Sequence, residues 1–236
     1  LLKPLQMISG VVERRQTLPI LSNVLVSLDN SELSLTGTDL EVELAGKIKV
    51  DKANSGGEIT VPARKLFDIC KSLPDNSLIE FIINENKCLV NSGRSKFSLL
   101  TLPSTEFPKV VEEQETLSFK LSQARLKDLI EATSFAMAQQ DVRYYLNGML
   151  FEIANQTVKL VATDGHRLAM SELALEGFES DRQIILPRKG IIEMSRLLSD
   201  GNGDITLSLG TNQIRASMPE YTFTSKLVDG NFPDYK

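Results

Sequence analysis

The chain has 236 residues, of which 42% are hydrophobic and 24% charged, and its formal net charge is −5. A negative total excludes a protein that grips nucleic acid over its whole surface, although it leaves room for a local basic lining. Because no apolar run approaches about 18 residues and the start shows no signal-peptide order, a cytoplasmic protein is expected.

The first half predicts two helices and several short strands. One helix is expected over residues 2–9, where Leu2, Leu5 and Ile8 share a face. Residues 41–50 alternate apolar and charged side chains, which is typical of a half-buried strand. A second helix is expected over residues 64–73, because a proline just ahead of a helix fits its first turn. Shorter strands are predicted at residues 24–28, 33–36, 78–83, 88–91 and 96–100.

The second half predicts the same elements again after a polar join near residues 108–116. Its helices are expected at residues 123–137 and 188–198. Its strands are expected at residues 146–153, 158–162, 205–209, 214–217 and 222–227. We therefore place a first domain at residues 1–111 and a second at residues 112–236.

A single step of 125 residues relates the two halves without a gap. It carries Pro62 onto Pro187, Thr38-Asp39 onto Thr163-Asp164 and Phe107-Pro108 onto Phe232-Pro233. Solenoid repeats are only about 20–50 residues long, so the repeating unit is a whole domain. The pattern predicts an α+β fold with two similar tandem domains, each with two helices packed on antiparallel sheets.

Few residues suggest catalysis or metal binding. The lone histidine, His166, could form an acid–base pair with Asp164. However, Thr163-Asp164 matches Thr38-Asp39, which has no histidine nearby, so a duplicated turn in which Asp accepts backbone N–H groups is the favoured interpretation. One histidine and two cysteines, expected to be reduced and partly buried, are too few for a transition-metal site. No catalytic residue, metal or cofactor is expected.

Both helices that follow a proline carry a base–acid–base pattern at matching positions. The residues are Arg64, Asp68 and Lys71 in the first half and Lys189, Glu193 and Arg196 in the second. Such a face is either a salt-bridged surface in water or a surface that faces a polyanion. In the second case Arg and Lys would contact phosphates without reading base sequence.

A third cluster precedes a strand of the second half. Tyr144 and Tyr145 follow Arg143, and such side chains can stack on bases or sugars. Equally, one tyrosine can belong to the core while the other is half exposed. Arg15 and Gln140 occupy the same loop position of the two halves.

Several segments resemble the bacterial β sliding clamps, the processivity subunits of DNA polymerase III. The resemblance extends over essentially the whole chain, and it is carried by Thr17–Leu21, Leu33–Glu41, Val61–Lys65, Asp141–Gly148, Ala162–Leu168 and Ser225–Tyr235. It implies a non-catalytic clamp fold in which two subunits of three domains each form a ring around duplex DNA. Relative to that family, the first domain lacks its N-terminal strand and the third domain is absent.

The resemblance also implies partners and site residues. The partners are double-stranded DNA, the polymerase III catalytic subunit, other polymerases, the clamp loader and, in the full-length family protein, a second subunit. DNA contacts are implied for Arg15, Arg64, Gln140, Tyr144 and Tyr145, with Lys189 and Arg196 as further candidates. A peptide pocket is implied at Leu146, Thr163, Gly165, His166, Arg167, Leu168 and Pro233. A subunit contact is implied at Lys65, Ile69, Leu73, Phe97 and Leu99.

Two alternatives stay open at this stage. An enzyme using Asp164 and His166 would lose turnover on replacement of the histidine, whereas a clamp would lose peptide binding. A purely structural two-domain protein with salt-bridged helices would not stimulate a polymerase.

Overall fold

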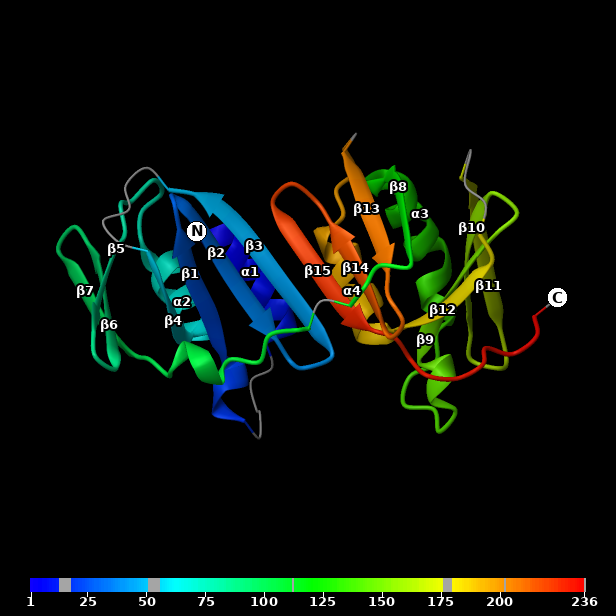
Figure 1. Cartoon of the computed structure of the whole chain (residues 1–236), viewed down its shortest axis with the longest axis horizontal. Helices are drawn as coiled ribbons and strands as arrows, with labels where there is room; N and C mark the ends of the chain where they lie inside the picture. The colour runs from blue at the N-terminus through cyan, green and yellow to red at the C-terminus, as the bar shows by residue number, and fades with distance from the viewer. Residues whose placement is uncertain (13–17, 51–55, 112, 176–179, 202, 236) are drawn as a thin grey trace. The chain divides into compact units, whose positions relative to one another are not determined.

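The computed structural model describes the chain except residues 13–17, 51–55, 112, 176–179, 202 and 236, so Arg15 lies outside the described residues. The chain forms two compact units (Figure 1). Unit 1 comprises Leu1–Val111 with Glu220–Thr222, and unit 2 comprises Glu112–Pro219 with Phe223–Lys236. Within the described residues, no helix is long and apolar enough to cross a membrane.

The described residues of unit 1 form two helices and two sets of antiparallel strands. The larger sheet has the order β4-β1-β2-β3 and the smaller one the order β5-β6-β7. The elements are α1 (Leu2–Val11), β1 (Asn23–Asp29), β2 (Glu32–Thr38), β3 (Val42–Lys49), β4 (Gly57–Pro62), α2 (Ala63–Ser72), β5 (Glu80–Asn84), β6 (Lys87–Ser92) and β7 (Ser95–Leu100), with 3-10 turns at Pro19–Ser22 and Ser104–Glu106.

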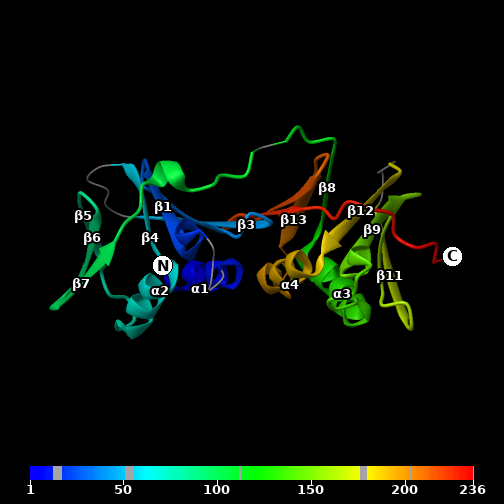
Figure 2. The ribbon, with the colours of Figure 1, turned by 90° about the horizontal axis from the view of Figure 1, so that it is seen from below.

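Both helices of unit 1 cover the same face of the larger sheet (Figure 2). In α1 the buried residues are Leu5, Ile8 and Val11, which recur at the spacing of one helix face. A Cβ atom at Gly37 of β2 would stand 2.5 Å from Cγ2 of Ile8. Glycine at this position therefore lets α1 approach the sheet closely.

In unit 2, too, the part that the structure describes forms two helices and two sets of antiparallel strands. The strand orders are β15-β14-β13-β8 and β11-β10-β9-β12. The elements are β8 (Leu117–Ser122), α3 (Gln123–Thr133), β9 (Gly148–Ala154), β10 (Thr157–Thr163), β11 (Leu168–Ala174), β12 (Arg182–Pro187), α4 (Arg188–Leu197), β13 (Asp204–Leu209), β14 (Gln213–Ser217) and β15 (Tyr221–Lys226), with 3-10 turns at Ser134–Ala136 and Tyr144–Leu146.

The sheet β11-β10-β9-β12 has an inner and an outer face. The inner face packs against the helices and buries Met149, Phe151 and Ile153 of β9. On the outer face, the backbone register aligns Met170, Val161, Leu150 and Ile185 in one row across the four strands. A second outer row consists of Glu172, Lys159, Glu152 and Gln183.

The elements confirm the expected duplication. The pairs β1 and β9, β2 and β10, β4 and β12, and α2 and α4 are offset by 125 residues at both ends. The tight turns match as well, since Asn30 and Asn155 both have positive φ, of 46° and 51°. The expected α+β class with antiparallel sheets is therefore present in both units.

Five elements differ from the prediction. Helix α3 ends at Thr133, and residues up to Ala136 continue as a 3-10 turn rather than as the same helix. The strands β4, β8, β11 and β12 were not expected. In β11 the residues Leu, Ala, Met and Glu favour helices, so pairing with β10 decides its conformation.

Candidate functional site

The turn between β10 and β11 is held by side chain–backbone hydrogen bonds. Thr163 Oγ1 donates to the Arg167 carbonyl at 2.7 Å and accepts from the Gly165 N–H at 3.1 Å. Asp164 Oδ1 accepts the N–H groups of His166 and Arg167, both at 3.0 Å. This is the bonding expected of a turn in which Asp captures nearby backbone N–H groups.

Unit 1 contains the same turn at its corresponding position. Thr38 Oγ1 donates to the Val42 carbonyl at 2.9 Å and accepts from the Leu40 N–H at 3.1 Å. Asp39 Oδ1 accepts the N–H groups of Glu41 and Val42 at 2.9 and 2.7 Å. The prediction of a duplicated Thr-Asp turn is confirmed.

The carboxylate of Asp164 is thereby used for structure. The backbone N–H groups of His166 and Arg167 lower its pKa, and the Arg167 guanidinium adds to the effect. A carboxylate in this role is stabilised as the anion and is a poor proton acceptor, which argues against the acid–base pair with His166. Within the described residues, no group of three or more His, Cys, Asp and Glu side chains could hold a metal ion.

Arg167 connects the turn to the end of the helical segment that begins with α3. Its Nε lies 3.0 Å from Asp164 Oδ2, and its Nη2 donates to the Phe135 carbonyl at 2.6 Å. The guanidinium carbon also lies 5.6 Å from the centroid of the Phe135 ring, in cation–π geometry. Arg167 is thus fixed in position although 57% of its side chain is exposed.

The loop before β9 is closed by a second set of bonds. Asn147 accepts the Asp141 N–H at 2.9 Å and donates to its carbonyl at 2.8 Å. Arg143 pairs with Asp141 through Nε at 3.0 Å and Nη2 at 2.9 Å, and its hydrogen bonds hold the pKa of Asp141 at about 2. Nη2 of Arg143 also donates to the Asp164 carbonyl at 3.5 Å. The loop and the β10–β11 turn are therefore adjacent.

The two tyrosines of this loop have different environments. Tyr144 is 57% exposed, whereas Tyr145 is partly buried against Leu150, Val161 and Ile185. Their rings meet edge to face, with centroids 5.9 Å apart. One tyrosine therefore belongs to the packed surface and the other is available for contacts. Gln140 is exposed and has a φ of 58°.

The last described residues of unit 2 cross the outer face of the sheet, and we call residues 228–235 strap 2. The Val228 N–H donates to the Ile185 carbonyl at 2.9 Å. Val228, Phe232 and Tyr235 pack on the row that contains Leu150, Val161 and Ile185, whereas Pro233 is exposed.

The seven residues implied for a peptide pocket fall into two groups. The exposed group consists of Gly165, His166, Arg167, Leu168 and Pro233. Leu146 is 1% exposed and Thr163 is 8% exposed. These two therefore support the surface from below, while the neighbouring β11 residue Met170, which the sequence did not single out, is 51% exposed.

The corresponding segment of unit 1 is residues 103–110, and we call it strap 1. Its Phe107 is buried with Ile20, Leu21 and Leu25. Glu43 stands where unit 2 has Leu168, and its Oε2 accepts the Val110 N–H at 3.2 Å. The apolar side chain at position 168 is therefore a specific difference between the two copies.

Helices α2 and α4 differ from the prediction of matching charged faces. In α2, Arg64 and Asp68 are exposed and 3.9 Å apart. In α4, Glu193 is buried and accepts from Arg196 at 2.7 Å, while Ile192 is 38% exposed. The interpretation that Glu193 is a surface residue is wrong, because the ion pair with Arg196 satisfies the buried carboxylate.

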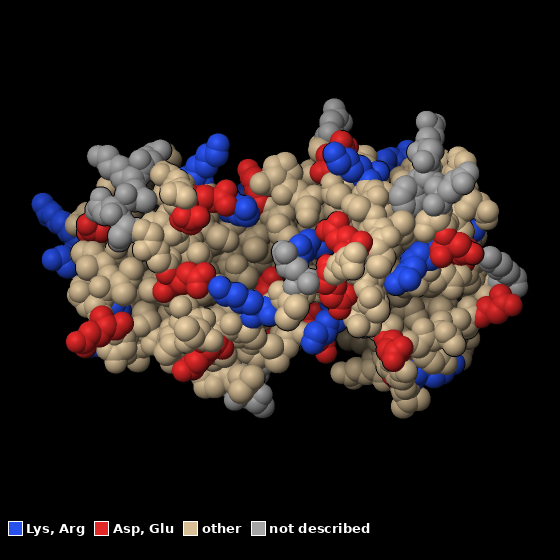
Figure 3. Space-filling view, in the orientation of Figure 1, with Lys and Arg blue, Asp and Glu red and all other residues tan. Residues whose placement is uncertain are grey.

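The basic candidates of unit 2 lie at both ends of α4. The Arg188 N–H donates to the Asn147 carbonyl at 2.9 Å, so the half-buried Lys189 begins a helix that adjoins the tyrosine loop. Arg196 lies in the last turn of the same helix, two turns away. On the face drawn in Figure 3, lysine and arginine are interspersed with aspartate and glutamate.

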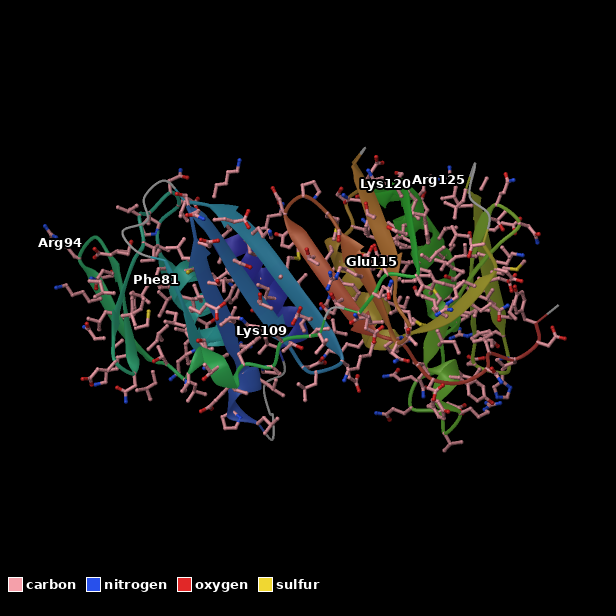
Figure 4. The ribbon with its side chains drawn as sticks, in the orientation of Figure 1. Phe81, Arg94, Lys109, Glu115, Lys120 and Arg125 are labelled. Atoms are coloured by element: carbon pink, nitrogen blue, oxygen red, sulfur yellow. The ribbon has the colours of Figure 1, made fainter. Side chains whose placement is uncertain are left out.

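The residues implied for a subunit contact lie in α2, after it and in the three-stranded sheet. Phe97 is half-buried in a row with Phe81 and Val90, and Leu99 is buried in a row with Ile83 and Cys88. Figure 4 labels Phe81 on β5 and Arg94 in the β6–β7 turn. Lys65 is exposed and Ile69 and Leu73 are half-buried. Ile83 at 54% and Leu100 at 67% are exposed apolar neighbours that the sequence interpretation missed.

Known proteins show strong similarity to both units. Residues 1–111 match the N-terminal domain of the DNA polymerase III beta subunit, and residues 120–234 match its central domain. The "Beta sliding clamp" of Pseudomonas aeruginosa is 59% identical over 237 aligned residues, which are 100% of this chain and 65% of that protein. The Escherichia coli K12 protein of the same description is 50% identical, with 64% of its length covered.

Solved structures agree with the sequence matches. A crystal structure of the DNA polymerase III subunit beta from Pseudomonas aeruginosa has a TM-score of 0.96 at 58% identity, and the match covers 99% of this chain and 64% of that one. Another, of a sliding clamp from the same organism bound to griselimycin, also has a TM-score of 0.96. These matches confirm the predicted clamp fold, although the chain spans less than two thirds of each relative. The chain belongs to the DNA polymerase III beta subunit family, of which it matches the N-terminal and central domains.

Proposed function

We propose that this chain provides the first two domains of a DNA sliding clamp, a cytoplasmic, non-enzymatic processivity factor of the bacterial replicative polymerase. The observation that carries the proposal is the match of both units, in order, to the two consecutive domains of the beta subunit. The carboxylate of Asp164 accepts two backbone N–H groups of its own turn, and this structural use supports a role without catalysis.

Sliding requires weak contacts that do not depend on base sequence. The proposed DNA contacts are Arg15, Arg64, Gln140, Tyr144, Tyr145, Lys189 and Arg196. The exposed guanidinium of Arg64 suits phosphate oxygens, and the exposed ring of Tyr144 suits stacking on a base or sugar. Because a ring holds DNA by encirclement, these contacts need not be tight.

The peptide site would dock polymerases and the clamp loader. The exposed Leu168 supplies an apolar contact beside Arg167, whose fixed guanidinium offers donors to a peptide at a low entropic cost. The proposed site is Leu146, Thr163, Gly165, His166, Arg167, Leu168 and Pro233. In unit 1, strap 1 is bonded to Glu43 at the position that matches Leu168, so we expect the site in unit 2 and not in unit 1.

We also propose that a second subunit contacts the patch containing Lys65, Ile69, Leu73, Phe97 and Leu99. Exposed Ile83 and Leu100 extend its apolar character. Leu99 itself is 4% exposed, so its part is to support Phe97 and not to touch the partner.

Retention on DNA tests the clamp function. The chain would be fused to the part of the Pseudomonas aeruginosa clamp that follows its central domain, and then loaded with that organism's clamp loader onto nicked circular DNA. A clamp stays on the closed circle and leaves when a single cut linearises it. Retention on linear DNA would show adhesion, and the ring proposal would then be wrong.

Ligand binding tests the peptide site. Griselimycin, which is bound to one of the similar clamps, is the probe, and its Kd would be measured with the wild-type chain. Leu168→Glu places the unit 1 residue in unit 2 and should weaken binding at least tenfold, because an unpaired carboxylate replaces an apolar contact. The reciprocal variant Glu43→Leu is the control and should leave the Kd unchanged. Equal binding by wild type and Leu168→Glu would exclude the site.

The histidine distinguishes a clamp from an enzyme. His166→Ala should reduce griselimycin affinity, because the exposed imidazole belongs to the proposed site. Loss of a turnover that the wild type shows would instead support the acid–base alternative.

A further inference from the structure

The ring of Phe135 is exposed beside two buried neighbours. Phe135 lies in the 3-10 turn Ser134–Ala136 that follows α3, and it is 58% exposed, whereas Ala136 and Met137 are 0% and 4% exposed. The centroid of its ring lies 5.6 Å from the guanidinium carbon of Arg167. The ring is therefore not part of the core, and replacing it should change the stability of the fold little.

The backbone that follows this turn is fixed independently of the ring. The Ala138 N–H donates to the Leu146 carbonyl at 3.0 Å. Nη1 of Arg188 donates to the Met137 carbonyl at 3.4 Å. A substitution of the Phe135 side chain should therefore leave the Phe135 carbonyl in place.

The guanidinium of Arg167 is bonded along one part and open along another. The last carbonyl groups of a helical segment lack partners within it, and a cation near them is favoured. Nη2 of Arg167 donates to such a carbonyl, that of Phe135, at 2.6 Å, while Nε lies 3.0 Å from Asp164 Oδ2. Among the described residues Nη1 has no hydrogen-bond partner, so its two N–H groups can reach an oxygen atom of a ligand.

The pair of Arg167 and Phe135 belongs to unit 2 alone. At the 125-residue step, Arg167 becomes Val42 and Phe135 becomes Gly10. The Thr-Asp turn is therefore duplicated, whereas the cation–π contact beside it cannot form in unit 1. The contact accompanies the unit in which the peptide site is proposed.

We propose that Phe135 is a positioning residue of the peptide site: its ring keeps the Arg167 guanidinium in the orientation in which Nη1 donates to a carbonyl oxygen of a peptide held beside Leu168. This inference rests on the proposed peptide-binding function. An arginine side chain loses rotamer freedom when a ligand immobilises it, and a contact that restricts it beforehand reduces that loss. Phe135 need not touch the ligand itself.

The test measures griselimycin affinity in Phe135→Leu, Phe135→Tyr, Arg167→Ala and the double variant of Phe135→Leu with Arg167→Ala. Phe135→Leu keeps an apolar side chain without the aromatic ring, and it should raise the Kd about two- to fivefold, the range expected for an exposed cation–π contact. Phe135→Tyr keeps the ring and should bind as the wild type does. Because the ring acts through Arg167, Phe135→Leu should have no further effect in the Arg167→Ala background.

A spectroscopic measurement separates positioning from a general structural role. Nitrogen relaxation of the Arg167 Nε–Hε group, followed by NMR, reports the fast motion of the guanidinium as an order parameter. The order parameter should fall in Phe135→Leu and return to the wild-type value in Phe135→Tyr. Thermal unfolding should shift little in either variant, because the ring is exposed.

Ile192→Ala is the control, because it removes another exposed apolar side chain, from α4 of the same unit. It should change neither the Kd for griselimycin nor the order parameter of Arg167.

The outcomes separate this inference from the proposed site. If Leu168→Glu weakens binding but Phe135→Leu or Arg167→Ala binds as the wild type does, the site stands and the positioning role is wrong. An equal effect of Phe135→Leu with and without Arg167 would also overturn it, since the ring would then act without the arginine. So would an unchanged order parameter in Phe135→Leu. If Leu168→Glu binds griselimycin as the wild type does, the proposed site itself fails.

Discussion

Leu40 and Gly165 occupy the same position of the duplicated Thr-Asp turn, and both have left-handed backbone, with φ of 78° and 87°. The N–H of each donates to the threonine two residues earlier at 3.1 Å. The hydrogen bonds of the turn therefore fix this conformation whether or not the residue is glycine.

Replacing the residue at either position by Gly and by Ala should reveal the strain. At position 165 the wild type should be more stable than Gly165→Ala by about 1 kcal/mol, because a Cβ is disfavoured in the left-handed region. At position 40, the free energy of unfolding of Leu40→Gly should exceed that of Leu40→Ala by a similar amount. Urea unfolding measures both differences. An Ala variant as stable as its Gly counterpart would show that the turn relaxes.

The threonine hydroxyls should contribute strongly to stability. Thr163→Val leaves the Gly165 N–H and the Arg167 carbonyl without their partner, so the free energy of unfolding should fall by about 1–3 kcal/mol. Thr38→Val should have an effect of the same size in unit 1. Thr163→Ser keeps the hydroxyl and is the control for shape. If Thr163→Val left the free energy of unfolding unchanged, water would have replaced the lost hydrogen bonds.

The carboxyl group of Asp141 should titrate at about pH 2, below its ordinary 3.8, because Arg143 hydrogen-bonds to the anion. A depressed pKa contributes stability that is present above about pH 4 and is lost as the pH falls toward 2. Carboxyl carbon shifts followed by NMR measure the midpoint. Arg143→Ala should raise it toward 3.8, and an unchanged midpoint would contradict the ion pair.

Both cysteines should be unreactive in the folded chain. Burial raises the pKa of Cys88 to about 11 and also raises that of Cys70, so little thiolate exists near pH 8. A chromogenic disulfide reagent should modify neither thiol at pH 8 and both in guanidinium chloride. Rapid modification of Cys88 without denaturant would show that the three-stranded sheet opens, and rapid modification of Cys70 would show that α2 detaches.

The periodicity of the sequence predicts most elements because each half buries one face of its helices and strands. Strand β8 follows the alternating pattern of Leu117, Phe119 and Leu121 and could have been found. Strand β11 could not, since its residues favour a helix and only pairing with β10 determines it. Glu193 was misplaced because periodicity assigns a charged residue to the surface. The ion pair that allows its burial is visible only in the folded structure.

The candidate site was only partly accessible to sequence reasoning. The 125-residue step identifies the Thr-Asp turn without a structure, and the resemblance supplies the residues around it. The contrast between Glu43 and Leu168 was present in the sequence but had no meaning before strap 1 was seen bonded to Glu43. Phe135 and Tyr235 act through packing against residues that are distant in the chain, and such contacts leave no motif in the sequence.

Strand β11 lies at the end of its sheet order, so among the described strands one of its edges has no neighbour in that sheet. Such an edge can recruit another extended chain by backbone pairing. Glu172 is the single charged residue of the strand, and its charge disfavours pairing between the β11 edges of two copies of the chain. Replacement of that one side chain by a neutral one should accordingly make concentrated preparations more prone to associate.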